Sequence, residues 1–94
     1  MGRSLIKRPK RLGEKLRAIR MRLGLSQTEI LETLVSADYV IHKGDISNYE
    51  LAKSEPPLVI LLRYARSGGV TMESLVDDEL ELSKKPLTGK VTPQ

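Results

Sequence analysis

The stretch GLSQTEI, residues 24–30, decides the fold together with ISNYE, residues 46–50. In the first stretch, Ser26 is expected to cap the first turn of a helix, and Glu29 to reach back to the Ser26 backbone. The second stretch places its isoleucine and tyrosine on one helical face and its serine and asparagine on another. The sequence therefore predicts two short helices, one held against the protein and one that displays polar side chains.

Helical spacing continues on the N-terminal side of these stretches. Leu12, Leu16, Ile19 and Leu23 recur on one face, and Gly24 supplies a stop, so a helix is predicted over about residues 10–23. The next two helices are predicted over about 27–34, with Ile30, Leu31 and Leu34 buried, and 44–51. Residues 35–42 permit two interpretations, an extension of the second helix or a turn with one short extended segment.

Two further helices are predicted after a polar link at residues 52–55. Pro56 and Pro57 fit the first turn of a helix, and the pair Gly68-Gly69 ends it. Thr71 is expected to cap a short fifth helix. The apolar residues expected to face the core from these two helices are Leu58, Leu61, Leu62, Ala65, Met72, Leu75 and Val76.

These elements predict an all-α protein, a compact five-helix bundle. The helical domain is predicted at residues 10–82, between a flexible basic arm at 1–9 and a disordered tail at 83–94. A chain of 94 residues makes one small domain.

The composition argues against several classes of function. Because the chain has no cysteine and its single histidine is His42, a disulfide framework, a thiolate metal site and a cysteine nucleophile are all excluded. We expect no enzyme, no metal and no cofactor. No apolar run is long enough for a signal peptide or a membrane span, so we expect a cytoplasmic protein without a membrane partner.

The positive charge gathers at one end of the chain. Residues 1–22 contain nine Lys or Arg residues and one acid, whereas the remaining residues carry a small excess of acids. A basic block of this kind indicates a polyanionic partner or a solvated face with a solubilising tail. Charge alone leaves both interpretations open.

The order of these features resembles the phage-repressor and Cro-type (XRE-like) helix-turn-helix family, which has a lambda-repressor-like fold. The resemblance covers residues 11–80. It rests on Leu12-x3-Leu16-x2-Ile19-Arg20-x2-Leu23-Gly24-Leu25-Ser26-Gln27-x2-Ile30, on Ile46-Ser47-x-Tyr49-Glu50, on Pro57 with the leucine-rich helix, and on Gly69-Val70-Thr71-x3-Leu75.

The resemblance implies a sequence-specific, double-stranded DNA-binding transcriptional regulator of bacterial or phage type, associated with the nucleoid, with repression as the expected mode. Its helix at about 44–51 would read bases in the major groove. The implied phosphate contacts are Arg8, Lys10, Arg11, Gln27 and Lys53, the implied base-reading residues are Lys43, Gly44, Ser47 and Asn48, and the implied structural ion pair is Arg20 with Glu50.

Each DNA-contact role has a plainer alternative, in which Gln27 is a solvated first-turn residue and the reading positions are ordinary surface. Proteins of this type bind as dimers, so a weak homodimer is expected. No small-molecule ligand is evident. The expected dimer surface lies on the fifth helix and comprises Met72, Leu75, Val76, Leu80 and Leu82.

The chain departs from the family pattern in two places. The connection between the second and third helices is about five residues longer than usual. Leu51-Ala52 stands where a pair ending in glycine is common, so the third helix either runs longer or ends with strain. Asp45 is expected to cap this helix rather than to accept a bond from cytosine.

The alternative function is an antitoxin-like or adaptor module that uses the same fold to bind another protein. Two features suggest it, the long connection at residues 35–43 and the acidic run Asp77-Asp78-Glu79-x-Glu81.

Overall fold

Five helices make up the part of the chain that the computed structural model describes, residues 9–37 and 39–82. They are α1 (Leu12–Leu23), α2 (Gln27–Leu34), α3 (Lys43–Glu50), α4 (Leu58–Gly68) and α5 (Met72–Val76). Within these residues the all-helical prediction is confirmed, since no strand is present and β pairing is limited to one isolated bridge. The predicted arm, apart from Pro9, and the predicted tail lie outside the described residues.

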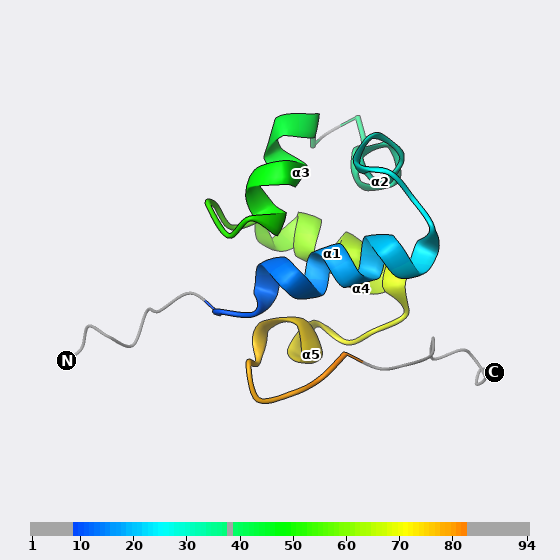
Figure 1. Cartoon of the computed structure of the whole chain (residues 1–94). Helices are drawn as coiled ribbons and strands as arrows, with labels where there is room; N and C mark the ends of the chain where they lie inside the picture. The colour runs from blue at the N-terminus through cyan, green and yellow to red at the C-terminus, as the bar shows by residue number, and fades with distance from the viewer. Residues whose placement is uncertain (1–8, 38, 83–94) are drawn as a thin grey trace, which may run out of the picture.

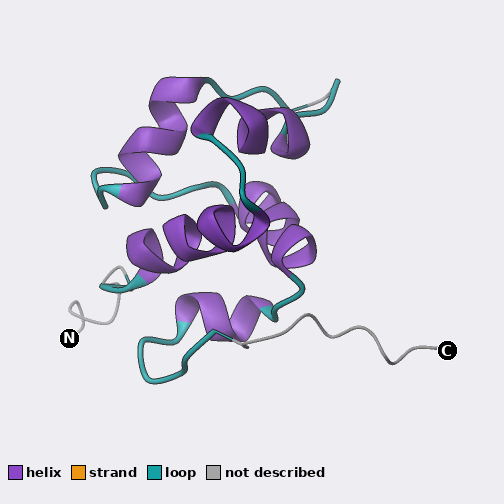
Figure 2. Ribbon diagram, turned by 45° about the vertical axis from the view of Figure 1, so that its right-hand side comes forward, coloured by secondary structure: helices purple, strands orange, loops and turns teal. Residues whose placement is uncertain are grey.

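Helix α1 runs through the middle of the molecule. Helices α2 and α3 lie on one side of it and α5 lies on the other, as both Figure 1 and Figure 2 show. Helix α1 packs against α3, α4 and α5, while α2 packs against α3 and α4. The two helices that the opening stretches predict therefore form one end of the molecule, supported by α1 and α4.

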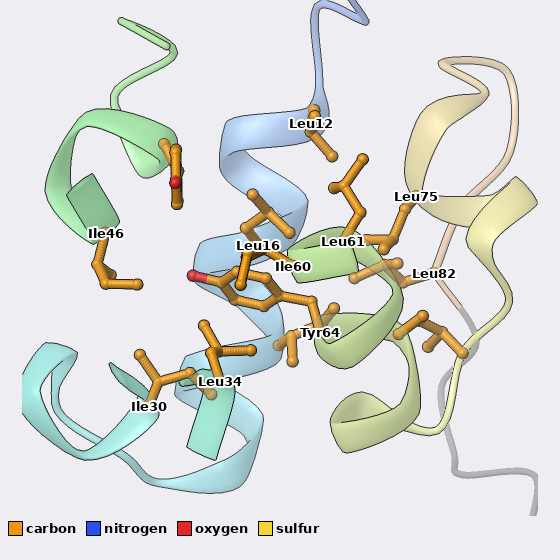
Figure 3. Packing of buried hydrophobic residues seen from close by; sticks show 14 of the residues in the cluster. Leu12, Leu16, Ile30, Leu34, Ile46, Ile60, Leu61, Tyr64, Leu75 and Leu82 are labelled. Atoms are coloured by element: carbon orange, nitrogen blue, oxygen red, sulfur yellow. The ribbon is translucent and has the colours of Figure 1, made fainter. Parts of the chain in front are cut away.

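The core draws side chains from all five helices (Figure 3). Each fully buried aliphatic side chain contributes roughly 1.5–3 kcal/mol relative to an exposed one. The largest fully buried side chains are Leu16, Ile19, Ile30, Leu34, Ile46, Ile60, Tyr64 and Leu75.

The predicted inward face of α4 is correct only in part. Leu61 and Ala65 are buried as predicted, but Leu58 is 72% exposed, and Ile60 and Tyr64, which were not predicted to face the core, are completely buried. The run of five apolar residues at 58–62 gives no unique helical phase. The phase is instead set by a close approach, because a Cβ added at Gly68 would lie 2.9 Å from the Ile19 side chain. Positions 60, 64 and 68, spaced four residues apart, therefore face α1.

Burial of Tyr64 leaves its hydroxyl without a hydrogen-bond partner among the described residues. Burial also raises the pKa of this phenol well above its usual value. An unpaired buried hydroxyl costs about 1–3 kcal/mol, which opposes the gain from burying the ring.

Helix α2 begins as the sequence predicts. The Ser26 hydroxyl accepts from the Glu29 N–H at 3.1 Å, and the Glu29 carboxylate accepts from the Ser26 N–H at 2.8 Å. Helix α3 begins with a related cap, in which the Asp45 carboxylate accepts from the backbone N–H of His42 at 2.8 Å. The expectation that Asp45 caps α3 is thus confirmed.

Helix α3 ends with strain rather than running longer. Its chain reverses through Ala52, which has a φ of 63°, in the left-handed region that Gly24 and Gly69 occupy after α1 and α4. The N–H of Lys53 donates to the carbonyl of Asn48 at 2.8 Å, which closes the turn. A left-handed conformation costs a residue with a side chain roughly 1–2 kcal/mol.

The connection between α2 and α3 forms a turn, so the alternative of a longer second helix is wrong. Helix α2 ends at Leu34, and Ser36 and Tyr39 exchange backbone hydrogen bonds of 3.1 and 3.2 Å. Ile41 is buried and fixes the end of this connection to the core, while Val40 is 65% exposed. The added residues thus form a separate projection beside the start of α3.

Helix α5 is attached to α1 by polar contacts. The buried Lys15 ammonium donates to the carbonyls of Ser74 and Asp77 at 2.7 and 2.8 Å. The Asp78 carboxylate accepts from the backbone N–H groups of Lys10 and Arg11 at 2.8 and 3.0 Å. Asp78 therefore caps the N-terminus of α1, a role that the Arg11 side chain does not fill.

The expected dimer surface on the fifth helix is smaller than predicted. Leu75 is completely buried and Leu82 is 9% exposed, so both belong to the core. Leu80 and Val76 are the exposed members of the set. Within the described ranges, no helix is long and apolar enough to cross a membrane.

Replacing Gly13 with alanine is expected to destabilise the fold. An added Cβ would lie 2.7 Å from the carbonyl oxygen of Glu50 and 2.9 Å from that of Tyr49, so α1 and α3 would have to separate. Overpacking of this kind costs about 1–3 kcal/mol, more than the helix propensity that alanine adds. Denaturant unfolding measures the change.

Gly44→Ala is the matched control, because nothing lies within 4 Å of a Cβ built on Gly44. This variant is expected to gain up to about 1 kcal/mol of stability. Equal unfolding midpoints for Gly13→Ala and the parent would contradict the close approach.

Asp78→Asn is expected to lower the melting temperature at neutral pH and to matter less in acid. Hydrogen bonds from the Lys10 and Arg11 backbone lower the pKa of the Asp78 carboxyl. A carboxyl whose pKa is lower in the folded state stabilises the fold above its unfolded pKa, about 3.9, and loses this effect as the pH falls through the folded value. The difference in melting temperature should therefore shrink below about pH 4.

Glu79→Gln serves as the control, since Glu79 is an exposed acid one residue along the same turn. Its melting temperature should follow the parent across the series. A difference between Asp78→Asn and the parent that persists unchanged at the lowest pH would refute the cap.

Candidate nucleic-acid interface

Helix α3 buries one face against the protein and exposes the opposite face to solvent. Ile46 and Tyr49 are buried against the rest of the protein (Figure 3 labels Ile46). Because the helix begins at Lys43, the four predicted reading residues occupy one face at positions i, i+1, i+4 and i+5. Three of these residues, Lys43, Gly44 and Asn48, are exposed and Ser47 is partly buried. The structure thus brings the four residues together on the outward surface of α3.

A two-bond ion pair ties this helix to α1. Arg20 donates to the two carboxylate oxygens of Glu50, from Nε at 2.7 Å and from Nη2 at 3.0 Å. The side chains of Arg20 and Glu50 are only 12% and 4% exposed, so solvent screens the pair weakly. Arg20 also donates to the carbonyl of Leu25 at 3.0 Å, which fixes the turn before α2. The three helices α1, α2 and α3 therefore share one arginine.

Gln27 joins the same network. Its side-chain amide nitrogen donates to the Glu50 carboxylate at 3.3 Å. The side-chain amide of glutamine has two N–H donors and one acceptor oxygen. The bond to Glu50 uses one N–H, so Gln27 keeps a second donor and its oxygen for another partner. Glu50 consequently orients Gln27 at the N-terminus of α2, where the first backbone N–H groups of a helix lack partners within it.

A shallow groove unites these elements. Its lining comes from α1, from the start of α2 and from the outward side of α3. The lining residues are Glu14, Arg17, Arg20, Gln27, Ser47, Glu50 and Leu51.

Arg17 is the basic residue in this groove that was not predicted from the sequence. It is exposed, and no hydrogen bond or ion pair joins it to another residue of the described part of the chain. Its position three residues before Arg20 puts both on one side of α1. That spacing was the available signal, and it was hidden among the nine bases scattered over residues 1–22.

The other predicted phosphate contacts are divided by the structure. Lys53 is exposed in the turn after α3, and Lys10 is exposed just before α1. Arg11 is held within the protein, since it donates to Glu14, to the Asp78 carbonyl and to Glu81 at 3.3, 2.9 and 2.9 Å. Arg8 lies outside the described residues.

The first described residue, Pro9, lies beside the turn that follows α3. Pro9 lines a small cavity together with Tyr49, Ala52 and Ser54. The chain therefore enters the fold next to the end of α3 and to Lys53.

The comparisons with known proteins add no assignment. The sequence matches no family model, and no curated protein is significantly similar to it. Among residues 9–37 and 39–82, no group of histidine and acidic side chains could hold a metal ion. Function is accordingly inferred from the residues that surround α3.

Glu50→Ala is expected to destabilise the protein by about 3 kcal/mol. It leaves the largely buried Arg20 guanidinium without its charged partner, which is far costlier than losing a surface ion pair. Gln27→Ala removes only a long, neutral donor and should cost less than about 1 kcal/mol. Thermal or denaturant unfolding compares the two.

A double variant separates charge burial from packing. Arg20→Leu with Glu50→Leu removes both charges, so its stability should recover well above that of Glu50→Ala. If Glu50→Ala alone unfolded at the parent's denaturant midpoint, the ion pair would have no role in holding α3.

Proposed function

We propose that this chain is a sequence-specific, double-stranded DNA-binding regulator of the lambda-repressor-like helix-turn-helix type. In this proposal α3 enters the major groove and α2 rests across the phosphate backbone. The observation that carries the proposal is the contrast between the two faces of α3. One face is locked by burial and by the Arg20–Glu50 pair, and the other presents Lys43, Gly44, Ser47 and Asn48 to solvent.

The chemistry of the outward face suits base edges. Lysine donates to guanine acceptors, and asparagine pairs in two bonds with adenine. Gly44 leaves open space on this face, since nothing lies within 4 Å of a Cβ placed there. Because Gly44 has no side chain, the backbone of α3 could approach the floor of the DNA major groove closely.

The phosphate contacts would come from residues around this face. Gln27 and Arg17 line one groove beside Ser47, and Lys53 follows the C-terminal end of α3. A guanidinium and an amide at a helix N-terminus are typical partners of a backbone phosphate. Lys10 would add a fourth contact, and Arg11 is omitted because its guanidinium is engaged by acids.

The alternative of a protein-binding module receives less support. The acidic run that suggested it is partly used inside the fold, since Asp78 caps α1 and Glu81 pairs with Arg11 at 2.9 Å. These groups are therefore not freely available to a partner. A regulator that binds inverted half-sites as a weak homodimer stays part of the proposal.

Selection of bound duplexes from a random DNA library tests the proposal directly. We expect an enriched half-site, and we expect affinity for it to fall steeply between about 50 and 200 mM salt, because counterions are released from the contacted phosphates. Paired half-sites about one helical turn apart would report the dimer. Failure to enrich any sequence, with no salt-sensitive binding, would overturn the proposal.

Single substitutions distinguish reading from phosphate contact. Asn48→Ala should lose about 1–3 kcal/mol of discrimination at one base pair and little elsewhere. Arg17→Ala should weaken binding to all sequences and reduce the salt slope by about one. Anisotropy titrations of the selected duplex and of a scrambled one measure both effects.

Arg66→Ala is the matched control for Arg17→Ala. It removes the same charge from an exposed position in the last turn of α4, outside the groove that Arg17 lines. It should leave the salt slope unchanged. Equal slopes for the parent and Arg17→Ala would remove Arg17 from the interface.

A further inference from the structure

His42 stands directly before α3 with an exposed imidazole. It is the residue that precedes Lys43 at the N-terminal end of α3, and its side chain is 83% exposed. Its Nδ1 lies 3.8 Å from the nearest Asp45 carboxylate oxygen, too far for a hydrogen bond.

The backbone of His42 is fixed although its side chain is not. The His42 N–H donates to Asp45 at 2.8 Å, and the His42 carbonyl accepts from the N–H of Asp45 at 2.9 Å. The direction in which the imidazole leaves the chain is therefore set by α3 itself. In the docking geometry of the proposed function, the N-terminal end of this helix is the part that reaches the base edges.

We propose that His42 is a further DNA-contacting residue that donates, in its protonated form, to an acceptor on the DNA. This inference rests on the proposed function. A protonated imidazole carries two N–H donors and a positive charge, and the DNA surface offers phosphate oxygens and the N7 and O6 acceptors of guanine. Binding then takes up a proton, so affinity rises as the pH falls.

The charged side chains of the protein near the imidazole do not by themselves strongly favour its protonated form. Asp45 attracts the protonated ring, whereas the exposed Lys43, next in the chain, repels it. Tyr49 lies near enough to Asp45 and to Tyr39 for both to act on its hydroxyl, but both tyrosines are uncharged near neutrality. The two charges on α3 oppose one another, and the DNA supplies the net negative field.

The composition of the chain makes this proton uptake measurable. His42 is the single histidine in 94 residues, and histidine is the side chain that ordinarily changes charge between pH 5 and 8. A change in affinity across this interval can therefore be assigned by substitution at one position. Nothing in the reading of bases by Asn48 requires a proton.

The test measures the affinity of the full chain for the selected duplex at constant salt from pH 5.5 to pH 8. The parent should bind about three- to tenfold more tightly at pH 5.5. His42→Gln, which is neutral throughout, should bind weakly at both limits. His42→Lys, which is charged throughout, should bind tightly at both. Circular dichroism and melting curves at each pH establish that all three proteins are folded.

The outcomes separate the two proposals. A parent whose affinity does not change with pH, or a His42→Gln variant that keeps the full change, overturns the role of His42 and leaves DNA binding standing. Absence of binding at every pH overturns the proposed function as well. A scrambled duplex assigns the acceptor, since an equal change on both duplexes indicates a phosphate and a change confined to the selected duplex indicates guanine.

Discussion

The position of α3 depends on the two-bond ion pair between Arg20 and Glu50. Its short N–O distances and low exposure make it costly to break on one side, because the remaining charge would stay in a desolvated site. Gly13 permits the pair to form, since its missing side chain lets α1 approach the backbone at the end of α3. One ion pair and one close approach thus hold α3 from its inner side and leave its outer side open.

Several basic residues that suggest a polyanion partner are structural. Lys15 donates to carbonyls at the end of α5, Arg20 holds α3, and Arg11 is engaged by two acids. These three account for a third of the nine bases in residues 1–22. Charge counting therefore overstates the electrostatic contribution of α1 itself. Arg17 and Lys10 are bases of this block that the structure leaves exposed.

Helix limits were predictable wherever a local signal determines them. The Ser26–Glu29 capping box and the glycines at 24 and 69 each act within a few residues of the helix ends that they set. The inward face of α4 was not predictable, because its phase depends on how Gly68 fits against Ile19, two residues far apart in sequence. The attachment of α5 likewise depends on Asp78 meeting the backbone of Lys10 and Arg11, which no local pattern reveals.

For the candidate site, the uncertain feature was the register of α3. The longer connection allowed α3 to start at several positions, and the turn at Ser36 and Tyr39, with Ile41 buried behind it, selects Lys43. That choice puts Gly44 and Asn48 on the outer face and leaves His42 at its edge. The same residues that lengthen the connection therefore determine which side chains DNA would meet. A shift of α3 by one residue would rotate the helix by about 100°, so that only one of Ser47 and Asn48 would stay on the outer face.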